Sequence, residues 1–314
     1  MIKLIIKIII CAILMAATMA LIWVIPGTHP HDLAALLNKK EMLIVKPSPR
    51  MILVGGSSVL SMKSELISKE LRYNVIDMSS WGGMGTYEIL EEIKPYLKPA
   101  DVILVTMEYG TILDKKFYEY IHTNDEAKKF LFLMSPGRHI LESLKKGEFF
   151  SLFKLMHELA QMKTKSFLLK IVTLNFSHLF DIGFPGFKDE FNANGDRNSP
   201  YMIFRPLGDS KTNFSYPEWE KLSFLNDFND FAAKHQARVL FYFSHFPENK
   251  YKENLTFINA YYELMKKNFK GTIINKPSDF VYPEEYFADT IYHLNEKGES
   301  VRTPEMIKLL KKAL

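Results

Sequence analysis

The chain contains 314 residues with a mass of 36.5 kDa, and its 40 lysines and arginines nearly balance 36 aspartates and glutamates. A formal charge of +4 is too small for the strongly basic surface of a nucleic-acid-binding protein. Hydrophobic residues make up 47% of the chain and charged residues 24%, which excludes both wholesale disorder and a protein with many membrane spans. A single cysteine, Cys11, excludes an internal disulfide and a zinc site built from cysteines.

An apolar run with one polar side chain covers residues 8–25 and ends at Pro26. At about 1.5 Å per helical residue, this run and the apolar residues just before it can cross a bilayer core of roughly 30 Å. Lys3 and Lys7 flank the run and no acidic residue lies in 1–27, so the positive-inside rule predicts a cytoplasmic N-terminus. The rest of this single-pass cell-membrane protein is then extracytoplasmic, either periplasmic or extracellular.

A cleaved signal peptide is the alternative to a retained anchor. Residues 18–20 could form a cleavage site, but the apolar run continues beyond them. We therefore expect a retained transmembrane anchor over residues 1–27. Residues 28–49 end in a proline-rich turn, show little periodicity and are expected to form a linker or a wrapping segment that lifts the domain off the membrane. The body of the protein is then residues 50–314.

The body alternates short apolar runs with helical segments. Continuous apolar runs that end in a turn are typical of buried parallel strands, and the crossovers between such strands are right-handed. The alternation predicts an α/β domain with three layers, α/β/α, around a five-stranded parallel sheet. The predicted strands are residues 51–54, 74–78, 102–107, 238–243 and 272–274, and the predicted helices are residues 60–72, 86–97, 217–235, 253–268 and 299–313.

A helical insertion is predicted after the third strand, at about residues 111–215. Residues 111–180 hold eleven Lys and Arg against seven Asp and Glu, a net charge of +4, interleaved with phenylalanines. This pattern fits a solvated basic face over a small core, and alternatively a surface that rests on anionic lipid headgroups. The expected helices of the insertion are residues 127–134, 139–146 and 149–169, followed by a loop region at 181–216 rich in glycine and proline.

Three blocks of the sequence fall at or near the carboxyl ends of strands, where reactive groups collect in an open parallel sheet. Gly56-Ser57-Ser58 follows the first strand, Ser80-Trp81-Gly82-Gly83 follows the second, and residues 289–298, with Asp289 and His293, precede the last helix. These blocks resemble the SGNH/GDSL hydrolase superfamily. Its members carry a Gly-Asp-Ser-like nucleophile block, a glycine donor block, and an aspartate and a histidine ahead of the final helix. The resemblance covers roughly residues 50–110 and 236–314.

The resemblance implies an SGNH/flavodoxin-like sheet and a serine mechanism. Ser58 takes the position of the nucleophile, with Ser57 as the rival serine. His293 is then the general base, and Asp289 orients the imidazole and stabilises the imidazolium. The backbone amides of Ser58 and Gly83 take the place of the oxyanion hole.

Two features depart from the family pattern. The superfamily places its aspartate three residues before the histidine, whereas Thr290 occupies that position here and Asp289 lies one residue earlier. The family's Gly-x-Asn-Asp block after the third strand is absent, and residues 107–110, Met-Glu-Tyr-Gly, stand in its place. For His245, after the fourth strand, a partly buried loop histidine is the favoured interpretation. The candidate substrate-binding residues are Glu108, Tyr109 and His245.

A membrane-tethered domain with these blocks looks most like extracytoplasmic acyl-transfer proteins that work beside membrane-bound O-acyltransferases. The D-alanine transfer protein of teichoic acid modification and the accessory proteins of polysaccharide O-acetylation are the examples. That similarity implies an acyltransferase or esterase that acts on an envelope or secreted glycan through an acyl-Ser58 intermediate, without a metal or a dissociable cofactor. It also implies a membrane-bound O-acyltransferase as a partner.

Two other classes of function stay open at this point. The first is a catalytically inactive SGNH-like scaffold that binds glycan or the membrane partner, which the missing Gly-x-Asn-Asp block favours. The second is a phosphate or nucleotide binder that uses residues 55–58, Gly-Gly-Ser-Ser, as an anion-binding turn. This second class is weak because the sequence has neither the G-x-G-x-x-G nor the P-loop pattern there.

Overall fold

The computed structural model describes residues 10, 13–14, 17, 31–60, 62–123, 125–172, 191–197 and 212–314. Apart from four of its residues, the expected membrane span at 8–25 lies outside this part of the chain, as does the alternative cleavage site. No helix in the described part combines the length and the apolar character that a membrane crossing requires. The chain divides into two compact units, one of Met1–Ala34 and Lys128–Phe187, the other of Ala35–Ala127 and Lys188–Leu314.

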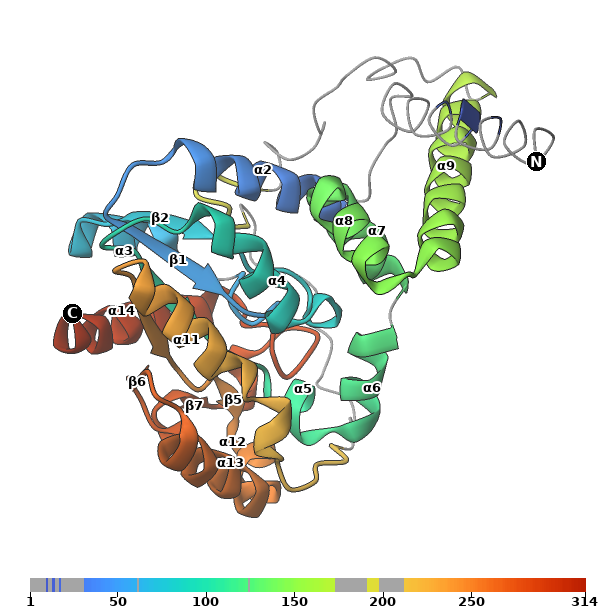
Figure 1. Cartoon of the computed structure of the whole chain (residues 1–314). Helices are drawn as coiled ribbons and strands as arrows, with labels where there is room; N and C mark the ends of the chain where they lie inside the picture. Colours follow the sequence, from blue (N-terminus) through green and yellow to red (C-terminus); the bar gives the residue numbers. More distant parts are fainter. Residues whose placement is uncertain are drawn as a thin grey trace. The chain divides into compact units, whose positions relative to one another are not determined.

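The larger unit, Ala35–Ala127 with Lys188–Leu314, is built on a sheet of five parallel strands in the order β2-β1-β3-β4-β6 (Figure 1). The predicted α/β fold with a five-stranded, all-parallel sheet is therefore confirmed. Each strand begins within one residue of its predicted start. The side chains of β1 and β3 are all buried, as expected for central strands of a parallel sheet, whereas the edge strand β6 is partly exposed. The strands are β1 (Arg50–Val54), β2 (Asn74–Asp77), β3 (Val102–Val105), β4 (Arg238–Phe241) and β6 (Thr272–Ile273).

Helices cover the sheet, which explains why its strands are apolar on both faces. Met51 and Leu53 of β1 pack in one core cluster with Ile67 of α3 and Met306 of α14. Successive strand side chains point to opposite faces, so the equally buried Ile52 faces the layer where α4 contacts β1 and α11 contacts β4. This arrangement is consistent with three layers. The helices are α3 (Ser64–Leu71), α4 (Thr86–Ile93), α11 (Phe224–Lys234) and α14 (Glu296–Ala313).

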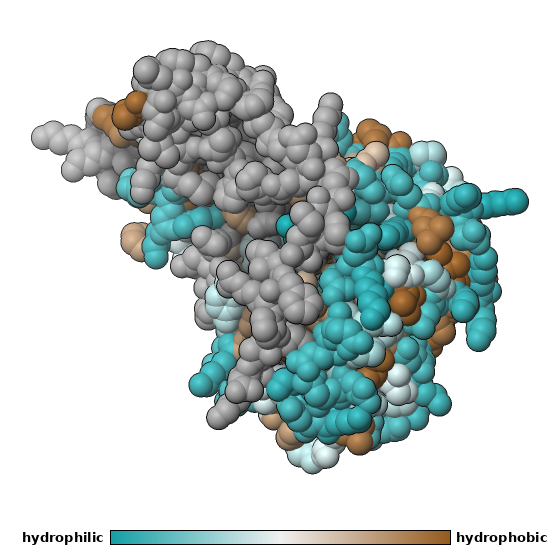
Figure 2. Space-filling model, turned by 180° about the vertical axis from the view of Figure 1, so that it is seen from behind, coloured by the Kyte–Doolittle hydropathy of each residue, from teal (hydrophilic) through white to brown (hydrophobic). Residues whose placement is uncertain are grey.

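Further short elements complete the larger unit. A short parallel pair of strands, β5 and β7, was not predicted from the sequence. On the face shown in Figure 2, the described residues are mostly hydrophilic, with apolar side chains scattered among them, as on an ordinary water-facing surface. The elements are η1 (Gly82–Met84), η2 (Lys94–Tyr96), η3 (Trp219–Lys221), β5 (Phe246–Pro247), α12 (Glu248–Glu253), α13 (Leu255–Asn268), η4 (Pro277–Phe280), β7 (Val281–Tyr282) and η5 (Glu284–Tyr286).

Helices follow β3, as the sequence predicts for the insertion. In the smaller unit, α7 and α9 are joined by an ion pair of 2.9 Å between Lys129 and Glu158. The expected loop region at 181–216 lies outside the described residues except for 191–197 and 212–216. The helices after β3 are α5 (Tyr109–Leu113), α6 (Lys115–Thr123), α7 (Asp125–Met134), α8 (Pro136–Lys146) and α9 (Phe149–Val172).

The segment expected to be a linker is mostly helical, as α2 (His31–Val45). Leu36 and Leu43 of this helix are buried, and so is Lys39, whose Nζ donates to the carbonyl of Ser79 at 2.7 Å. A buried lysine on the inner face hides the apolar periodicity that would have indicated a helix. The buried residues of α2 belong to the larger unit, which fits a wrapping segment and not a free linker.

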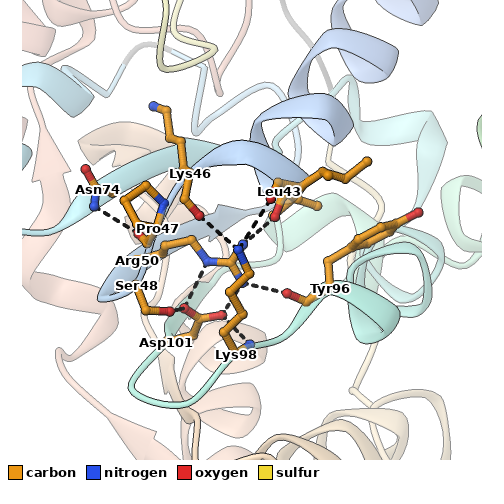
Figure 3. Close-up of polar contacts among 10 residues, drawn as sticks. Leu43, Lys46, Pro47, Ser48, Arg50, Asn74, Tyr96, Lys98 and Asp101 are labelled. Atoms are coloured by element: carbon orange, nitrogen blue, oxygen red, sulfur yellow. Dashed lines mark hydrogen bonds and ion pairs between the residues drawn. The ribbon is translucent and has the colours of Figure 1, made fainter.

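A buried ion pair fastens the start of β1 to its surroundings (Figure 3). The guanidinium of Arg50 pairs with the carboxylate of Asp101, and neither side chain is exposed. Arg50 also donates to the carbonyl oxygens of Leu43 and Tyr96, while the amide of Lys98 donates to Asp101 at 2.8 Å. These bonds join the end of α2, the turn before β3 and the first strand, at the edge of the sheet opposite the carboxyl ends.

Candidate active site

A cavity of about 480 Å³ lies beyond the carboxyl ends of β1, β2 and β3. The strand order reverses between β1 and β3, which is where ligands bind in open parallel sheets. The cavity is lined by members of all three blocks that the sequence singles out, together with the residue that replaces the Gly-x-Asn-Asp block. These residues are Ser57, Gly82, Gly83, Glu108, Asp289 and His293.

Asp289 and His293 form a direct contact, with 2.7 Å between Asp289 Oδ1 and His293 Nδ1. The chain between them folds into a turn, because the amide of His293 donates to both the carbonyl and the hydroxyl of Thr290. The turn brings the carboxylate back onto the ring across the four-residue spacing. Asn295 then begins α14 by accepting from the amides of Lys297 and Gly298, which fixes the end of this loop.

The environment of His293 favours a neutral imidazole. Burial lowers the pKa of His293 below its ordinary value, while the hydrogen bond and the charge of Asp289 act in the opposite direction. Because a carboxylate only accepts, Nδ1 carries the hydrogen in this contact and Nε2 keeps its lone pair. A neutral ring in this tautomer can take a proton from a hydroxyl in the cavity.

The turn after β1 presents Ser57 to the cavity and buries Ser58. Ser57 Oγ lies 3.1 Å from Glu108 Oε1, whereas Ser58 has no exposed surface and its hydroxyl has no partner among the described residues. The amide of Val59 closes the turn on the carbonyl of Gly56 at 3.0 Å, which rotates Ser58 toward the core. Of the two candidate serines, Ser57 lines the cavity and Ser58 does not. The structure brings the rival serine, Ser57, together with the histidine and the aspartate.

The backbone of Ser58 is held from both sides. Its carbonyl accepts a hydrogen bond from Nη1 of the fully buried Arg302 in α14. Its amide donates to Glu108 Oε1 at 2.9 Å. The amide expected to face an oxyanion is therefore engaged within the protein. Gly83, the other expected donor, lines the cavity.

Glu108 follows β3 and is almost completely buried. Its carboxyl group lies so close to Gly56 and Gly82 that a Cβ on either residue would come within 2.5 Å or 2.8 Å of a carboxyl oxygen. Burial raises the pKa of Glu108, and the hydrogen bonds from Ser58 and Ser57 partly offset that effect. Both glycines are therefore required for the carboxyl to reach this place between the turn at Ser57 and Ser58 and the glycine block.

The two other candidate substrate contacts lie away from the cavity. The Tyr109 ring is fully buried and packs edge-on against Phe246, with 4.9 Å between ring centroids. His245 is also fully buried, with Nε2 2.8 Å from the carbonyl of Tyr292. Burial and the charge of Arg302 hold the pKa of His245 well below its usual range. Both residues support the loops around the site.

Aromatic side chains form walls of the cavity that the sequence analysis did not identify. Trp81 and Tyr292 come from the two predicted blocks, and Phe117 and Tyr120 come from α6 in the insertion. The rings of Phe117 and Tyr120 lie 5.9 Å apart between centroids. Their spacing of three residues predicts that both rings lie on one face of a helix. Nothing in the sequence indicates that this face lies beside Ser57.

No group of three or more His, Cys, Asp or Glu side chains within the described ranges is arranged to hold a metal ion. The site therefore consists of a serine, a histidine with its aspartate, a buried glutamate and aromatic walls. No known family model matches the sequence, and comparison with curated proteins gives no match either.

Proposed function

We propose that this protein is a membrane-anchored, extracytoplasmic serine acyltransferase or esterase of the SGNH type. Ser57 is the nucleophile, His293 the general base, and Asp289 the group that orients the imidazole. The observation that carries the proposal is that one cavity gathers these side chains from opposite ends of the sequence, with Asp289 already 2.7 Å from His293. The strand order, which is that of flavodoxin-like sheets, supports the same assignment.

The reaction proceeds in two steps through an acyl-enzyme. Ser57 Oγ attacks the carbonyl carbon of an ester while His293 Nε2 takes the hydroxyl proton, and the negative charge of Asp289 stabilises the imidazolium. The departing alcohol receives that proton and leaves an acyl-Ser57 ester. A second hydroxyl, from a sugar or from water, then attacks the acyl carbon, and the same exchange of protons through His293 restores Ser57. These steps require neither a metal nor a dissociable cofactor.

We propose a glycan as the acyl acceptor. The aromatic walls support this class of acceptor, because the apolar C–H faces of sugar rings pack against aromatic rings while sugar hydroxyls bond to nearby polar groups. A sugar hydroxyl held in this way lies close to the acyl-serine and competes with water. A membrane-bound O-acyltransferase is the partner that we propose as the source of the acyl group.

Exposed side chains of the smaller unit support a place at a membrane. Within residues 141–153 of α8 and α9, five large apolar side chains are exposed next to Lys145 and Lys146, which are also exposed. Apolar side chains beside lysines are typical of helices that rest on anionic headgroups. The apolar run at 8–25 is the anchor in this proposal. The exposed apolar residues are Leu141, Leu144, Phe149, Phe150 and Phe153.

A catalytically silent scaffold that binds a glycan or a membrane partner is the second candidate. One observation favours it: the Ser57 hydroxyl is hydrogen-bonded to Glu108, and the Glu108 carboxyl occupies space beside the nucleophile. An ionised carboxylate in that position would repel the negative charge of a tetrahedral intermediate.

Hydrolysis of p-nitrophenyl acetate by the full-length protein in detergent separates the two candidates. Ser57→Ala and His293→Ala should each lower turnover by about three orders of magnitude or more. Ser58→Ala is the matched control, because it removes a buried hydroxyl that has no hydrogen-bond partner in the described part of the chain. A wild-type rate no higher than that of Ser57→Ala would favour the scaffold. Loss of activity in Ser58→Ala alone would restore Ser58 as the nucleophile.

A further inference from the structure

The two oxygens of the Glu108 carboxyl group have different surroundings. Oε1 accepts the amide of Ser58 at 2.9 Å and the hydroxyl of Ser57 at 3.1 Å. Oε2 lies beside the backbone of Gly82, where a Cβ would come within 2.8 Å of it, and Glu108 lines the cavity. Oε1 is therefore hydrogen-bonded to the turn at Ser57 and Ser58, and Oε2 lies between that turn and the glycine block.

The nearby cation in the described part of the chain is Arg302, and its guanidinium donates to the carbonyl of Ser58 rather than to Glu108. Within the described residues, no lysine or arginine forms an ion pair with Glu108. The titratable groups nearby are Tyr242 after β4, Tyr292 and His293 before α14, and Asp289 in the same cavity. Burial, and to a smaller extent the charge of an ionised Glu108, raises the pKa of both tyrosines, and burial also raises the pKa of Glu108. These surroundings favour a neutral carboxylic acid.

We propose that Glu108 is a catalytic residue that, as a neutral acid, donates a hydrogen bond from Oε2 to the oxyanion formed during acyl transfer. This inference rests on the proposed function, because it requires Ser57 to attack a carbonyl group in the cavity. A carboxylic acid offers one acceptor oxygen and one O–H donor, which matches the two different surroundings of Oε1 and Oε2.

The proton of Glu108 stays in place throughout the reaction. When Ser57 Oγ bonds to the carbonyl carbon, the electron pair of the C=O double bond moves to the substrate oxygen, and the serine proton goes to His293. The O–H of Glu108 hydrogen-bonds to that negative oxygen. When the pair returns, the bond to the leaving alcohol breaks and the alcohol takes the proton from His293. The same donor serves deacylation.

The active form then needs two neutral groups, His293 as base and Glu108 as donor. Activity should rise as pH increases through the pKa of His293 and fall as pH increases through the pKa of Glu108. With ordinary values the glutamate would ionise before the histidine became neutral. Burial lowers the pKa of His293 and raises that of Glu108, so the two shifts together favour a pH range in which both are neutral.

The test compares Glu108→Gln with Glu108→Ala in the full-length protein, with p-nitrophenyl acetate as the probe, between about pH 4 and pH 9. Glu108→Ala removes the donor and should lower kcat by about 10²–10³-fold with little change in KM. Glu108→Gln keeps an acceptor oxygen and supplies an N–H donor. It should recover most of the lost turnover, and the fall in rate at high pH should disappear because the amide does not ionise.

Glu88→Gln is the matched control. Glu88 is a half-buried glutamate whose pKa is also raised by burial, but it lines a separate cavity of about 190 Å³. Its replacement should leave both limbs of the pH profile in place, and circular dichroism would verify that all variants are folded.

Several results would overturn the inference. If Glu108→Gln is as inactive as Glu108→Ala, the carboxylate acts as a base, and if it is faster than the wild type at every pH, the carboxylate obstructs the site. Full activity of Glu108→Ala would exclude any catalytic role. Failure of the proposed function gives a different pattern: the wild type is then no faster than Ser57→Ala, and the inference falls with it.

Discussion

At the scale of single residues, the contact between Asp289 and His293 controls the state of the imidazole. Asp289 accepts from Nδ1, which leaves Nε2 as the proton acceptor. The charge of Asp289 also raises the pKa of His293 against the stronger effect of burial. Orientation and charge therefore come from the same carboxylate, and they can be separated by removing its charge alone.

Asp289→Asn should lower kcat for p-nitrophenyl acetate by about 10⁴-fold, because the amide permits the wrong tautomer and does not stabilise an imidazolium. The residual activity should keep its acid limb at a lower pH, since loss of the negative charge lowers the pKa of His293 further. A pH–rate profile measures both effects. Near-normal turnover of Asp289→Asn would show that His293 needs no carboxylate partner.

Gly82 tests whether the position of the Glu108 carboxyl matters. A Cβ at Gly82 would lie 2.8 Å from Glu108 Oε2 and 3.4 Å from the Phe117 ring, so Gly82→Ala must displace the carboxyl. We expect a loss of turnover similar to that of Glu108→Ala, with the protein still folded. Gly137→Ala is the control, because a Cβ there meets nothing within 4 Å. If Gly82→Ala and Gly137→Ala have equal turnover, the position of the Glu108 carboxyl beside Gly82 does not matter for activity.

At the scale of secondary structure elements, the Arg50–Asp101 pair joins three segments at the amino-terminal edge of the sheet. Asp101→Asn would leave the guanidinium of Arg50 buried without a negative partner. Removing one member of such a pair costs about 3–5 kcal/mol of unfolding free energy. Chemical denaturation should therefore show a large decrease for Asp101→Asn. Lys252→Ala is the control, because it breaks an exposed ion pair in α12 and should leave the denaturation midpoint nearly unchanged. If Asp101→Asn and Lys252→Ala have the same midpoint, the buried pair does not stabilise the fold as proposed.

The exposed apolar residues of α8 and α9 give a second prediction for whole elements. Phe150 is 82% exposed, so a polarity-sensitive fluorophore at Phe150→Cys, in a Cys11→Ala background, should shift to shorter wavelength in vesicles that contain anionic lipid. The same label at Lys267→Cys, an exposed position on α13, is the control. Identical spectra at the two positions in the full-length protein would exclude contact between this helix and the bilayer.

For the whole molecule, the strands and their parallel arrangement could be predicted because they depend on local runs of buried side chains. The histidine block could be predicted because Asp289 and His293 are close in sequence. Which of Ser57 and Ser58 faces the cavity could not be predicted, since it depends on a turn held by Glu108 and by Arg302, far away in the chain. The aromatic wall from α6 was missed for the same reason: only the folded sheet brings that helix to the cavity.

The bond between Arg302 and Ser58 links the order of synthesis to the order of assembly. The turn that contains Ser57 and Ser58 is synthesised early. The guanidinium of Arg302, which donates to the Ser58 carbonyl, belongs to α14 and follows 244 residues later. His293 also precedes α14 directly. A nascent chain that ends before its last helix therefore contains Ser57 but lacks both His293 and Arg302. Under the proposed function, such a chain cannot acylate itself or its neighbours, because the site is assembled only once this helix has folded onto the sheet.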